Sequence, residues 1–449
     1  MGGWILFTLN WPYYRVTIEN LHAFTGMMER VLSLDDVRVE GRVVLLRIDI
    51  NSPLDPSTGA FLDVTRIVEI LPTMHRLSKS KVVILCHQSR PGKRDFTTTS
   101  GHARELGRLL GRPVKWVNDI YGDGALLAID ELKIGEILML NNVRMDEEEI
   151  SRNNDSFELL ADSKMVQKLS GIADIFVNDA FACAHRNSPS MTGFTYALPC
   201  VAGELMKKEI DALQKALKNP VRPCIAVLGG IKIDDSIAVA DNMLRKGTAD
   251  EVWATGGVAN LLLSLSGHYP GDPSMNFLEQ ELGDAWGPTV EIAKKLLLDF
   301  PDVIILPVDV AANVADNRVD MRVEDLPVEA PLFDLGVQSI LKLSAAIRSA
   351  GTIILNGPAG VFELDNFAFG TIEMLNACAA SSADVVIGGG HTATLVGQRG
   401  LSQRMGHLST GGGACLDFIA GRKMPAISSL TESAARFGID IIEENQPQA

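Results

Sequence analysis

The sequence has little of what marks membrane, nucleic-acid-binding or zinc-knuckle proteins. No apolar run reaches the length that a bilayer-spanning helix needs. The 41 basic residues are outnumbered by 56 acidic ones, giving a net charge of −15, which argues against a general nucleic-acid-binding face. None of the six cysteines are close enough together to form a CxxC pair. We therefore expect a reduced, cytoplasmic protein that binds neither membrane nor nucleic acid.

The sequence also lacks a GxxxxGK[ST] phosphate-binding loop. The stretch Gly388–Ala393 does fit the pattern GxGxxA after an apolar run, so a nicotinamide-dependent dehydrogenase is one alternative. This pattern is weak by itself. It occurs late in the chain and is not followed by a second clear strand with an acidic residue, which the dinucleotide fold requires.

What the sequence does have is an alternation of strand and helix patterns. Short, almost continuous apolar runs are typical of parallel strands buried on both faces, and helical patterns separate them. The Gly- and Pro-rich segment Pro270–Pro288 predicts a surface loop. The predicted strands are Val43–Ile50, Lys81–Cys86, Ile137–Leu140, Ile175–Val177, Cys224–Leu228, Val252–Ala254, Val303–Leu306, Thr352–Leu355 and Val385–Ile387, and the predicted helices include Thr65–Leu77, Ala103–Leu110 and Val290–Leu298.

This alternation predicts an α/β protein with two Rossmann-like, doubly wound parallel-sheet domains. The segment Glu204–Lys218 has helical apolar spacing and predicts a hinge helix between the domains. We expect the first domain over 31–203 and the second over 219–425, with a tail, 426–449, that returns to the first domain. We expect residues 1–30 to be an N-terminal extension. Alternatively, the start was assigned too early and Met27 or Met28 is the true start.

In the first half, cationic and polar side chains follow the predicted strands. Each has an ordinary explanation alone: an Asx turn for Asp49 and Asn51, and a solvated charge for a lone arginine. Arginines and histidines at several equivalent strand ends instead predict a clamp for a carboxylate and a phosphate. The residues are Asp49, Asn51, Arg66, His87, Arg90, Arg144, His185 and Arg186.

In the second half, glycines occupy the equivalent places. Each glycine pair alone is best explained as a tight turn, but several together favour a phosphate cradle made of backbone N–H groups. Lys232 would contribute a point charge, and Glu363 is a candidate for binding ribose hydroxyls. The glycine segments are Gly229–Gly230, Asn356–Glu363, Gly388–Thr392 and Thr410–Ala414.

The ordered motifs resemble those of the phosphoglycerate kinase family from about Leu34 to about Ile427. They are RIDINSP (47–53), HQSRPG (87–92), NNVR (141–144), VNDAFACAHR (177–186), LGGIK (228–232), NGPAGVFE (356–363), GGGHT (388–392) and STGGGA (409–414). Three positions depart from the bacterial and eukaryotic pattern: Ser89, Ser236 and His391. The variants at Ser236 and His391 resemble the archaeal branch of the family.

The resemblance implies reversible phosphoryl transfer between 1,3-bisphosphoglycerate and ADP, giving 3-phosphoglycerate and ATP, with Mg²⁺ as cofactor. The domains of this family close on a hinge. The implied catalytic residues are Arg66, Lys232, Gly411, Gly412 and Gly413. The implied substrate site comprises Asp49, Asn51, Arg66, His87, Arg90, Arg144 and Arg186, and the implied nucleotide site comprises Lys232, Asn356, Glu363, Gly388, Gly389, Gly390, His391 and Thr392.

A non-catalytic paralogue is the main alternative. Such a protein would bind nucleotide or phosphoglycerate as a sensor or scaffold, and the changes at Ser236 and His391 motivate it. Because His391 replaces an aspartate that the family pattern uses as a metal ligand, the phosphates themselves are expected to hold most of the Mg²⁺.

Overall fold

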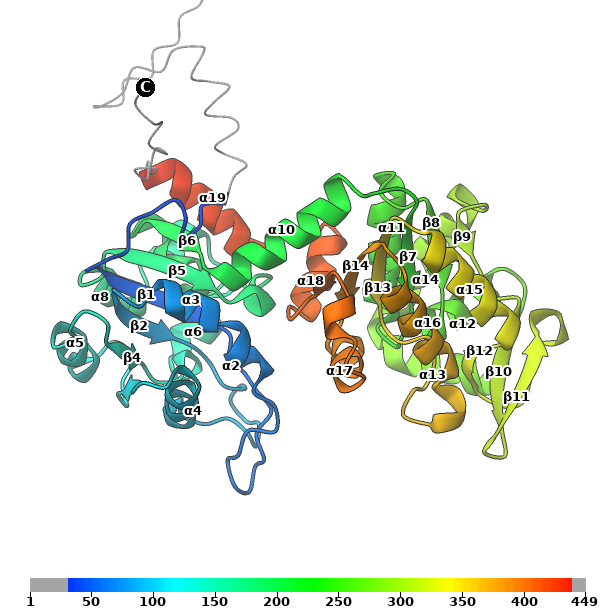
Figure 1. Ribbon diagram of the computed structural model, residues 1–449, viewed down its shortest axis with the longest axis horizontal. Coiled ribbons are helices and arrows are strands. Elements are labelled where there is room, and N and C mark those ends of the chain that lie inside the picture. Colours follow the sequence, from blue (N-terminus) through cyan, green and yellow to red (C-terminus); the bar gives the residue numbers. More distant parts are fainter. Residues whose placement is uncertain (1–30, 438–449) are drawn as a thin grey trace, which may run out of the picture. The chain divides into compact units, whose positions relative to one another are not determined.

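The computed structural model describes residues 31–437, which fold into two compact units (Figure 1). Within the described residues, the first unit comprises 31–179, 187–204 and 425–437, and the second comprises 180–186 and 205–424. Predictions for residues 1–30, including the alternative starts at Met27 and Met28, lie outside the described residues, as does the end of the tail after Phe437.

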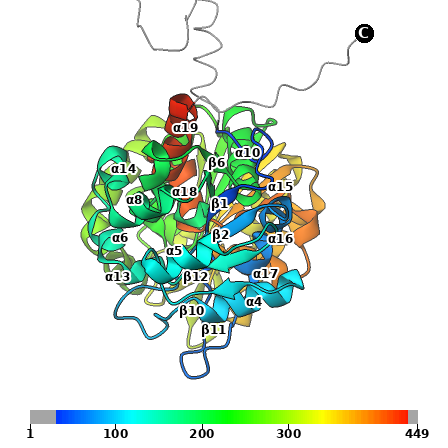
Figure 2. The same ribbon diagram turned by 90° about the vertical axis from the view of Figure 1, so that its left-hand side faces the viewer.

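The first unit is built on a six-stranded, wholly parallel sheet in the order β3-β4-β2-β1-β5-β6. Figure 2, which faces this unit, shows β6, β1 and β2 in that order across the sheet, and β5 pairs between β6 and β1. The strands are β1 Val43–Ile48, β2 Lys81–Leu85, β3 Lys115–Trp116, β4 Ile137–Met139, β5 Ile175–Asp179 and β6 Cys200–Ala202. The helices are α2 Thr65–Glu69, α3 Leu71–Arg76, α4 Ser100–Leu110, α5 Asp123–Asp130, η1 Val143–Met145, α6 Glu147–Ser151, α7 Phe157–Ala161, α8 Lys164–Ser170, α9 Pro189–Thr192, η3 Gly193–Tyr196 and α19 Pro425–Phe437.

Strand β1 lies at the centre of this sheet because almost all of its side chains are apolar and buried. It pairs in parallel with β2 on one side and β5 on the other, so the carboxyl ends of these three strands meet at one edge. Helix α19 joins the unit from the far end of the sequence, and Ser433 Oγ accepts a hydrogen bond of 2.9 Å from the N–H of Cys200 in β6.

The second unit has an equivalent six-stranded parallel sheet in the order β15-β14-β13-β7-β8-β9, and a separate antiparallel sheet, β11-β10-β12. The strands are β7 Cys224–Leu228, β8 Glu251–Ala254, β9 Ile304–Ile305, β10 Asp309–Val314, β11 Asn317–Arg322, β12 Leu332–Leu335, β13 Thr352–Asn356, β14 Asp384–Gly388 and β15 His407–Leu408. The helices are η2 Phe181–Cys183, α10 Glu204–Lys218, α11 Ile233–Arg245, α12 Gly256–Leu265, α13 Asp272–Leu282, η4 Gly283–Ala285, α14 Trp286–Asp299, η5 Val323–Asp325, α15 Val337–Ser349, η6 Asp365–Phe367, α16 Phe369–Ala380, α17 Gly390–Gln398, η7 Ser402–Arg404 and α18 Gly413–Ile419.

The predicted fold class is confirmed, and a strand occurs at each of the nine predicted positions. The predicted surface loop Pro270–Pro288 is wrong, because helices α13 and α14 occupy most of it. Pro273 and Pro288 lie in the first turns of these helices, where the missing N–H has no helical partner to lose. The predicted helix Thr65–Leu77 divides at Ile70, since Pro72 starts a new helix. Among residues 31–437, no helix is long and apolar enough to cross a bilayer.

Candidate functional site

The first unit brings several of the predicted substrate-site residues together at the carboxyl edge of its sheet. Asp49 and Asn51 follow β1, His87 follows β2, and Arg144 lies in η1 after β4. Arg66 reaches this edge from α2 and forms an ion pair with Asp49. Because β1, β2 and β4 are neighbouring parallel strands, their carboxyl ends collect these side chains.

Asp49 is a buried carboxylate surrounded by positive and donor groups. Burial alone would raise its pKa, but His87, Arg66 and Arg47 and a hydrogen bond from the N–H of Asn51 together hold the pKa below its usual value. Asp49 is therefore ionised at neutral pH and fixes the guanidinium of Arg66. The exposed third of the Arg66 side chain, 33%, leaves that guanidinium accessible to a ligand.

His87 is buried and neutral. Burial lowers its pKa to about 3, and the positive charge of Arg47 also lowers it, although Asp49 opposes the shift. Its Nδ1 lies 3.2 Å from Arg47 Nη2, which can only donate, so Nδ1 accepts and the proton is on Nε2. Nε2 has no partner among the described residues. His87 thus offers a fixed, uncharged donor.

A buried charge pair behind His87 was missed at the sequence level. Arg47 Nε donates to Ser190 Oγ at 3.0 Å, and that hydroxyl donates to Glu149 Oε1 at 2.7 Å. Ser188 also donates to Glu149, at 2.7 Å. Burial raises the pKa of Glu149, while Arg47 and the serine donors lower it in part. Glu149 lies in a run of three glutamates that is typical of a solvated helix face, so no sequence signal distinguishes it.

A second set of contacts ties the loops of this edge together. Ser89 N–H donates to Asn51 Oδ1 at 2.8 Å, and Arg144 donates to the carbonyl of Ser89. Ser89 has a φ of 57°, the left-handed region that favours glycine, so this position requires unusual backbone geometry. Arg90 is exposed, and no ion pair of its side chain occurs within 31–437.

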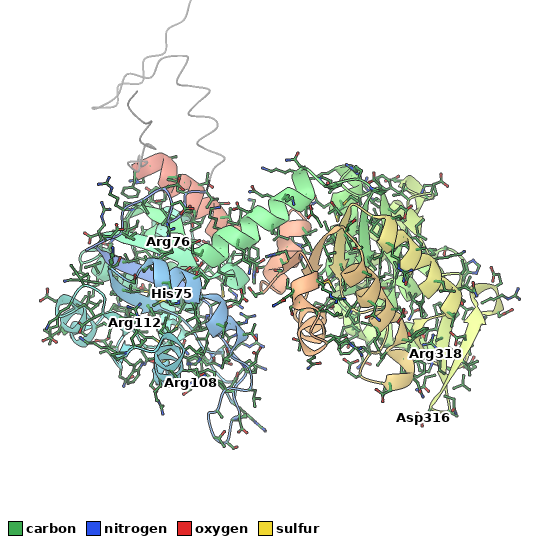
Figure 3. All side chains as sticks on the ribbon, in the orientation of Figure 1. His75, Arg76, Arg108, Arg112, Asp316 and Arg318 are labelled. Carbon is green, nitrogen blue, oxygen red and sulfur yellow. The ribbon has the colours of Figure 1, made fainter. Side chains whose placement is uncertain are left out.

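Arg186 belongs to the second unit, in the segment Ala180–Arg186, so the first unit alone does not contain the complete predicted clamp. Other arginines of the first unit have structural roles (Figure 3). Arg76 donates to the carbonyl of Leu34, and Arg112 donates to that of Gly135. These contacts separate the structural arginines from Arg66 and Arg90.

In the second unit, some of the predicted cradle glycines are explained by packing of the chain itself. A Cβ on Gly357 would lie 2.3 Å from the carbonyl oxygen of Gly229, and one on Gly229 would lie 2.5 Å from that of Pro358. The turns after β7 and β13 therefore pack backbone against backbone, which requires glycine. Asn356 closes this contact, since its carbonyl accepts from Gly229 N–H at 2.7 Å and its amide donates to Ser236 Oγ at 2.9 Å.

The glycine turn after β14 is different because it opens to free space at Gly390. Gly389 has a φ of 89° and precedes α17, and a Cβ on Gly390 would meet nothing within 4 Å. His391 and Thr392 follow in the first turn of α17. The hydroxyl of Thr392 is buried and has no hydrogen-bond partner among the described residues. This helix start combines backbone N–H groups with a hydroxyl that has no partner among the described residues, and both are groups that can donate to a phosphate.

The glycine turn before α18 is held by a buried glutamate of α10. Glu209 Oε1 accepts from Thr410 N–H at 2.8 Å, and Oε2 lies 2.8 Å from His407 Nε2. Gly412 and Gly413 have open space around them, whereas a Cβ on Gly411 would strike the ring of Phe181. The sequence places Glu209 among the charges of an amphipathic helix and gives no sign that it is buried.

Lys232 and Glu363 are exposed at two of these turns. Lys232 directly precedes α11, and Glu363 follows the turn after β13. Neither side chain forms an ion pair within 31–437. Both are thus available to a ligand of this unit.

The profile of the phosphoglycerate kinase family matches residues 34–422. The chain belongs to the phosphoglycerate kinase family. It is 45% identical over 408 residues to a phosphoglycerate kinase of Methanocorpusculum labreanum, covering 90% of this chain and 99% of that one. It is 46% identical over 402 residues to one of Methanobacterium bryantii, covering 89% and 97%.

Solved structures of the family have the same fold. A crystal structure of phosphoglycerate kinase from Pyrococcus horikoshii OT3 matches with a TM-score of 0.82 at 37% identity, covering 90% of this chain and 100% of that one. The Coxiella burnetii enzyme matches with a TM-score of 0.71 at 31% identity, covering 90% and 99%. The predicted resemblance and enzyme class are thereby confirmed: the chain is a phosphotransferase of the phosphoglycerate kinase family, and nothing found favours the dehydrogenase or the non-catalytic alternative.

Proposed function

We propose that the first unit binds 3-phosphoglycerate or 1,3-bisphosphoglycerate and the second binds ADP or ATP, and that phosphoryl transfer between them is the reaction of this chain. The observation that carries the proposal is the cluster of Asp49, Arg66, His87 and Arg144 at one sheet edge of the first unit. Arg66, His87 and Arg144 are donors of the kind that a carboxylate and a phosphate require, and Asp49 orients Arg66. A cytoplasmic location belongs to the same proposal.

On the substrate side, each group has a role that follows from its surroundings. His87 donates through Nε2 without adding charge, and Arg66 supplies an accessible guanidinium already oriented by Asp49. Arg90 and Arg144 contribute further positive charge, and Asn51 and Asp49 suit the hydroxyl of a small acid. Arg186 belongs to the second unit, so its part in substrate binding stays a prediction from the family resemblance.

On the nucleotide side, the turns at Gly388–Gly390 and Gly411–Gly413 would offer backbone N–H groups to phosphate oxygens, and Gly390, Gly412 and Gly413 have open space around them. Lys232 adds a charge for the transferred phosphoryl group, Glu363 suits the ribose, and Asn356 with Ser236 fixes the turn beneath them. Mg²⁺ prefers oxygen ligands, so the Thr392 hydroxyl and the phosphates would hold it, and His391 would not act as an oxygen ligand. When bound, the ion neutralises phosphate charge.

The chemistry requires alignment and charge neutralisation rather than a general base. The acyl phosphate has a good leaving group, and the attacking oxygen of ADP is already ionised. Arg66, Lys232 and the backbone of Gly411–Gly413 would stabilise the charge on the phosphoryl group in flight. Because both reactants must meet in line, closure of the two units during the cycle is part of the proposal.

Replacing Arg66 tests this assignment. Arg66→Ala removes a charge partner of the transition state, so we expect kcat to fall at least about a hundredfold. The measurement is a coupled assay with ATP and 3-phosphoglycerate. Arg108→Ala is the matched control, because Arg108 is an exposed arginine of α4 that pairs only with the nearby Glu105 among the described residues (Figure 3).

Two results would contradict the proposal. A loss confined to KM in Arg66→Ala would show that Arg66 binds the ground state and transition state equally. Saturable binding of both substrates without turnover by the unaltered chain would support a sensor or scaffold instead.

A further inference from the structure

The side chain of Gln88 is completely buried immediately behind the proposed phosphoglycerate site. Its Nε2 donates to the carbonyl of Ser52 at 3.0 Å, and its Oε1 lies 2.9 Å from His102 Nε2. Its backbone carbonyl accepts from Asn142 Nδ2 at 2.8 Å. One residue therefore contacts the loops that follow β1, β2 and β4.

Each of these three loops carries residues of the proposed site. Ser52 directly follows Asn51, Gln88 itself directly follows His87, and the side chain of Asn142 accepts from the N–H of Arg144 at 3.1 Å. A displacement of Gln88 would thus be transmitted to all three loops without any contact between Gln88 and the substrate.

The orientation of the Gln88 amide is determined by its partners. The Ser52 carbonyl can only accept, so Nε2 of Gln88 must face it, and Oε1 must accept from His102. His102 is therefore the Nε2–H tautomer. Its Nδ1 is buried without a partner among the described residues, and Phe61 packs edge-on against the ring with centroids 4.8 Å apart. His102 lies on α4, so this helix also holds the amide in place.

We propose that Gln88, oriented by His102, is a positioning residue that sets the relative places of His87, Asn51 and Arg144 for binding of the phosphoglycerate. The inference rests on the proposed function of this edge. It concerns substrate-side geometry alone, so its effect is confined to one of the two substrates.

Gln88→Met in the full chain is the main test, since methionine keeps the length and shape of glutamine but makes none of its side-chain hydrogen bonds, which include a longer one of 3.5 Å to Asp95 Oδ2. Loss of one or two hydrogen bonds predicts a rise of about five- to tenfold in the KM for 3-phosphoglycerate. The KM for ATP should stay within about twofold of the unaltered value. His102→Leu should give the same pattern, because it removes the donor that orients the amide.

Two further variants separate positioning from general loss of stability. His102→Gln restores a donor at the place of Nε2 and should return the KM for 3-phosphoglycerate to within about twofold of normal. Val166→Ala shortens a buried side chain of α8 in the same unit and should lower stability while changing neither KM. Equal rises in both KM values for Gln88→Met, or an equal rise for Val166→Ala, would overturn the inference.

Failure of the proposed function would be seen separately. If the unaltered chain showed no turnover, calorimetric titration of the same proteins with 3-phosphoglycerate would still test positioning. Binding weakened by Gln88→Met and restored in His102→Gln would support it, whereas equal affinity in all the proteins would overturn it.

Discussion

At the scale of single residues, the proposed substrate site combines a partly exposed arginine, Arg66, with two buried neighbours, Asp49 and His87. Burial and nearby positive charge lower the pKa of His87, while for Asp49 burial is outweighed by nearby positive charge and a backbone N–H, which lower its pKa. A site whose donors are oriented before the ligand arrives loses little reorganisation energy on binding. Arg66 is partly exposed, at 33%, and is oriented by its ion pair with Asp49, which suits a residue that presents a positive charge to a phosphoryl group.

A buried neutral histidine makes stability depend on pH, and His102 provides the test. Burial lowers its pKa to about 4. The unfolded chain therefore takes up the proton first, and the stability contributed above the ordinary pKa of about 6.5 is lost as pH falls toward 4. His102→Gln removes this titrating group. When the pH is lowered from 7 to 4.5, the unfolding free energy of the variant should therefore fall by about 2 to 3 kcal/mol less than that of the unaltered chain.

Urea unfolding at the two pH values measures this difference. His75→Gln is the control, because His75 is a solvent-exposed histidine of α3 in the same unit (Figure 3). If His75→Gln and His102→Gln changed the pH dependence equally, burial of His102 would not be its cause.

Some of these residues could be predicted from the sequence, because they lie next to a recognisable strand pattern, and others could not. Asp49, Asn51 and His87 directly follow apolar strand patterns, so their position was predictable from periodicity and topology. Glu149 and Glu209 lie in charged helical segments, where a buried carboxylate looks the same as a solvated one. Their partners, Ser190 and Thr410, are 41 and 201 residues away, and no local pattern connects them.

At the scale of elements, α10 and the turn before α18 act as one structure. Glu209 of α10 accepts hydrogen bonds from the N–H and the hydroxyl of Thr410 and also contacts His407 in β15. Gly411–Gly413 follow directly, so the backbone proposed to face the transferred phosphate is attached to this helix. Rigid support of such a turn keeps its N–H groups aimed at one point.

Removing the Glu209 carboxylate should therefore affect both stability and the nucleotide site. Glu209→Ala leaves a buried imidazole and a buried N–H without their acceptor, so we expect a loss of about 3 kcal/mol in unfolding free energy. We also expect a higher KM for ATP and an unchanged KM for 3-phosphoglycerate. Glu209→Gln retains the acceptor for Thr410 and should lose less than half as much stability.

Urea unfolding and the coupled assay give the two quantities. Lys215→Ala is the control on the same helix, since Lys215 forms an exposed ion pair with Asp384 that should contribute less than about 1 kcal/mol. A similar loss for Lys215→Ala and Glu209→Ala would argue against a special role for the buried carboxylate.

At the scale of the whole molecule, the two parallel sheets have the same architecture but carry different residues at their carboxyl edges. Each is six-stranded and parallel, and in each the candidate site lies at the carboxyl ends of central strands. This duplication was predictable because buried parallel strands have a strong apolar signal. The antiparallel sheet β11-β10-β12 was not, since β11 is largely exposed and polar, and its hairpin turns at Ala315 and Asp316 rather than at an Asn-Gly pair.

If each unit binds its own ligand, each ligand should protect its own unit from hydrogen exchange. Binding to the folded state alone stabilises by about 2.7 kcal/mol at a ligand concentration a hundred times Kd, and local opening near the ligand is suppressed first. We therefore expect 3-phosphoglycerate to slow exchange at 49–52, 87–90 and 142–144, and Mg-ATP to slow exchange at 388–392 and 409–413. Exchange measured by mass spectrometry on the full chain resolves these peptides. Arg66→Ala should weaken the protection by 3-phosphoglycerate at 49–52, 87–90 and 142–144 and leave the protection by Mg-ATP at 388–392 and 409–413 unchanged. Protection of 87–90 by Mg-ATP alone, or of 388–392 by 3-phosphoglycerate alone, would contradict the assignment of ligands to units.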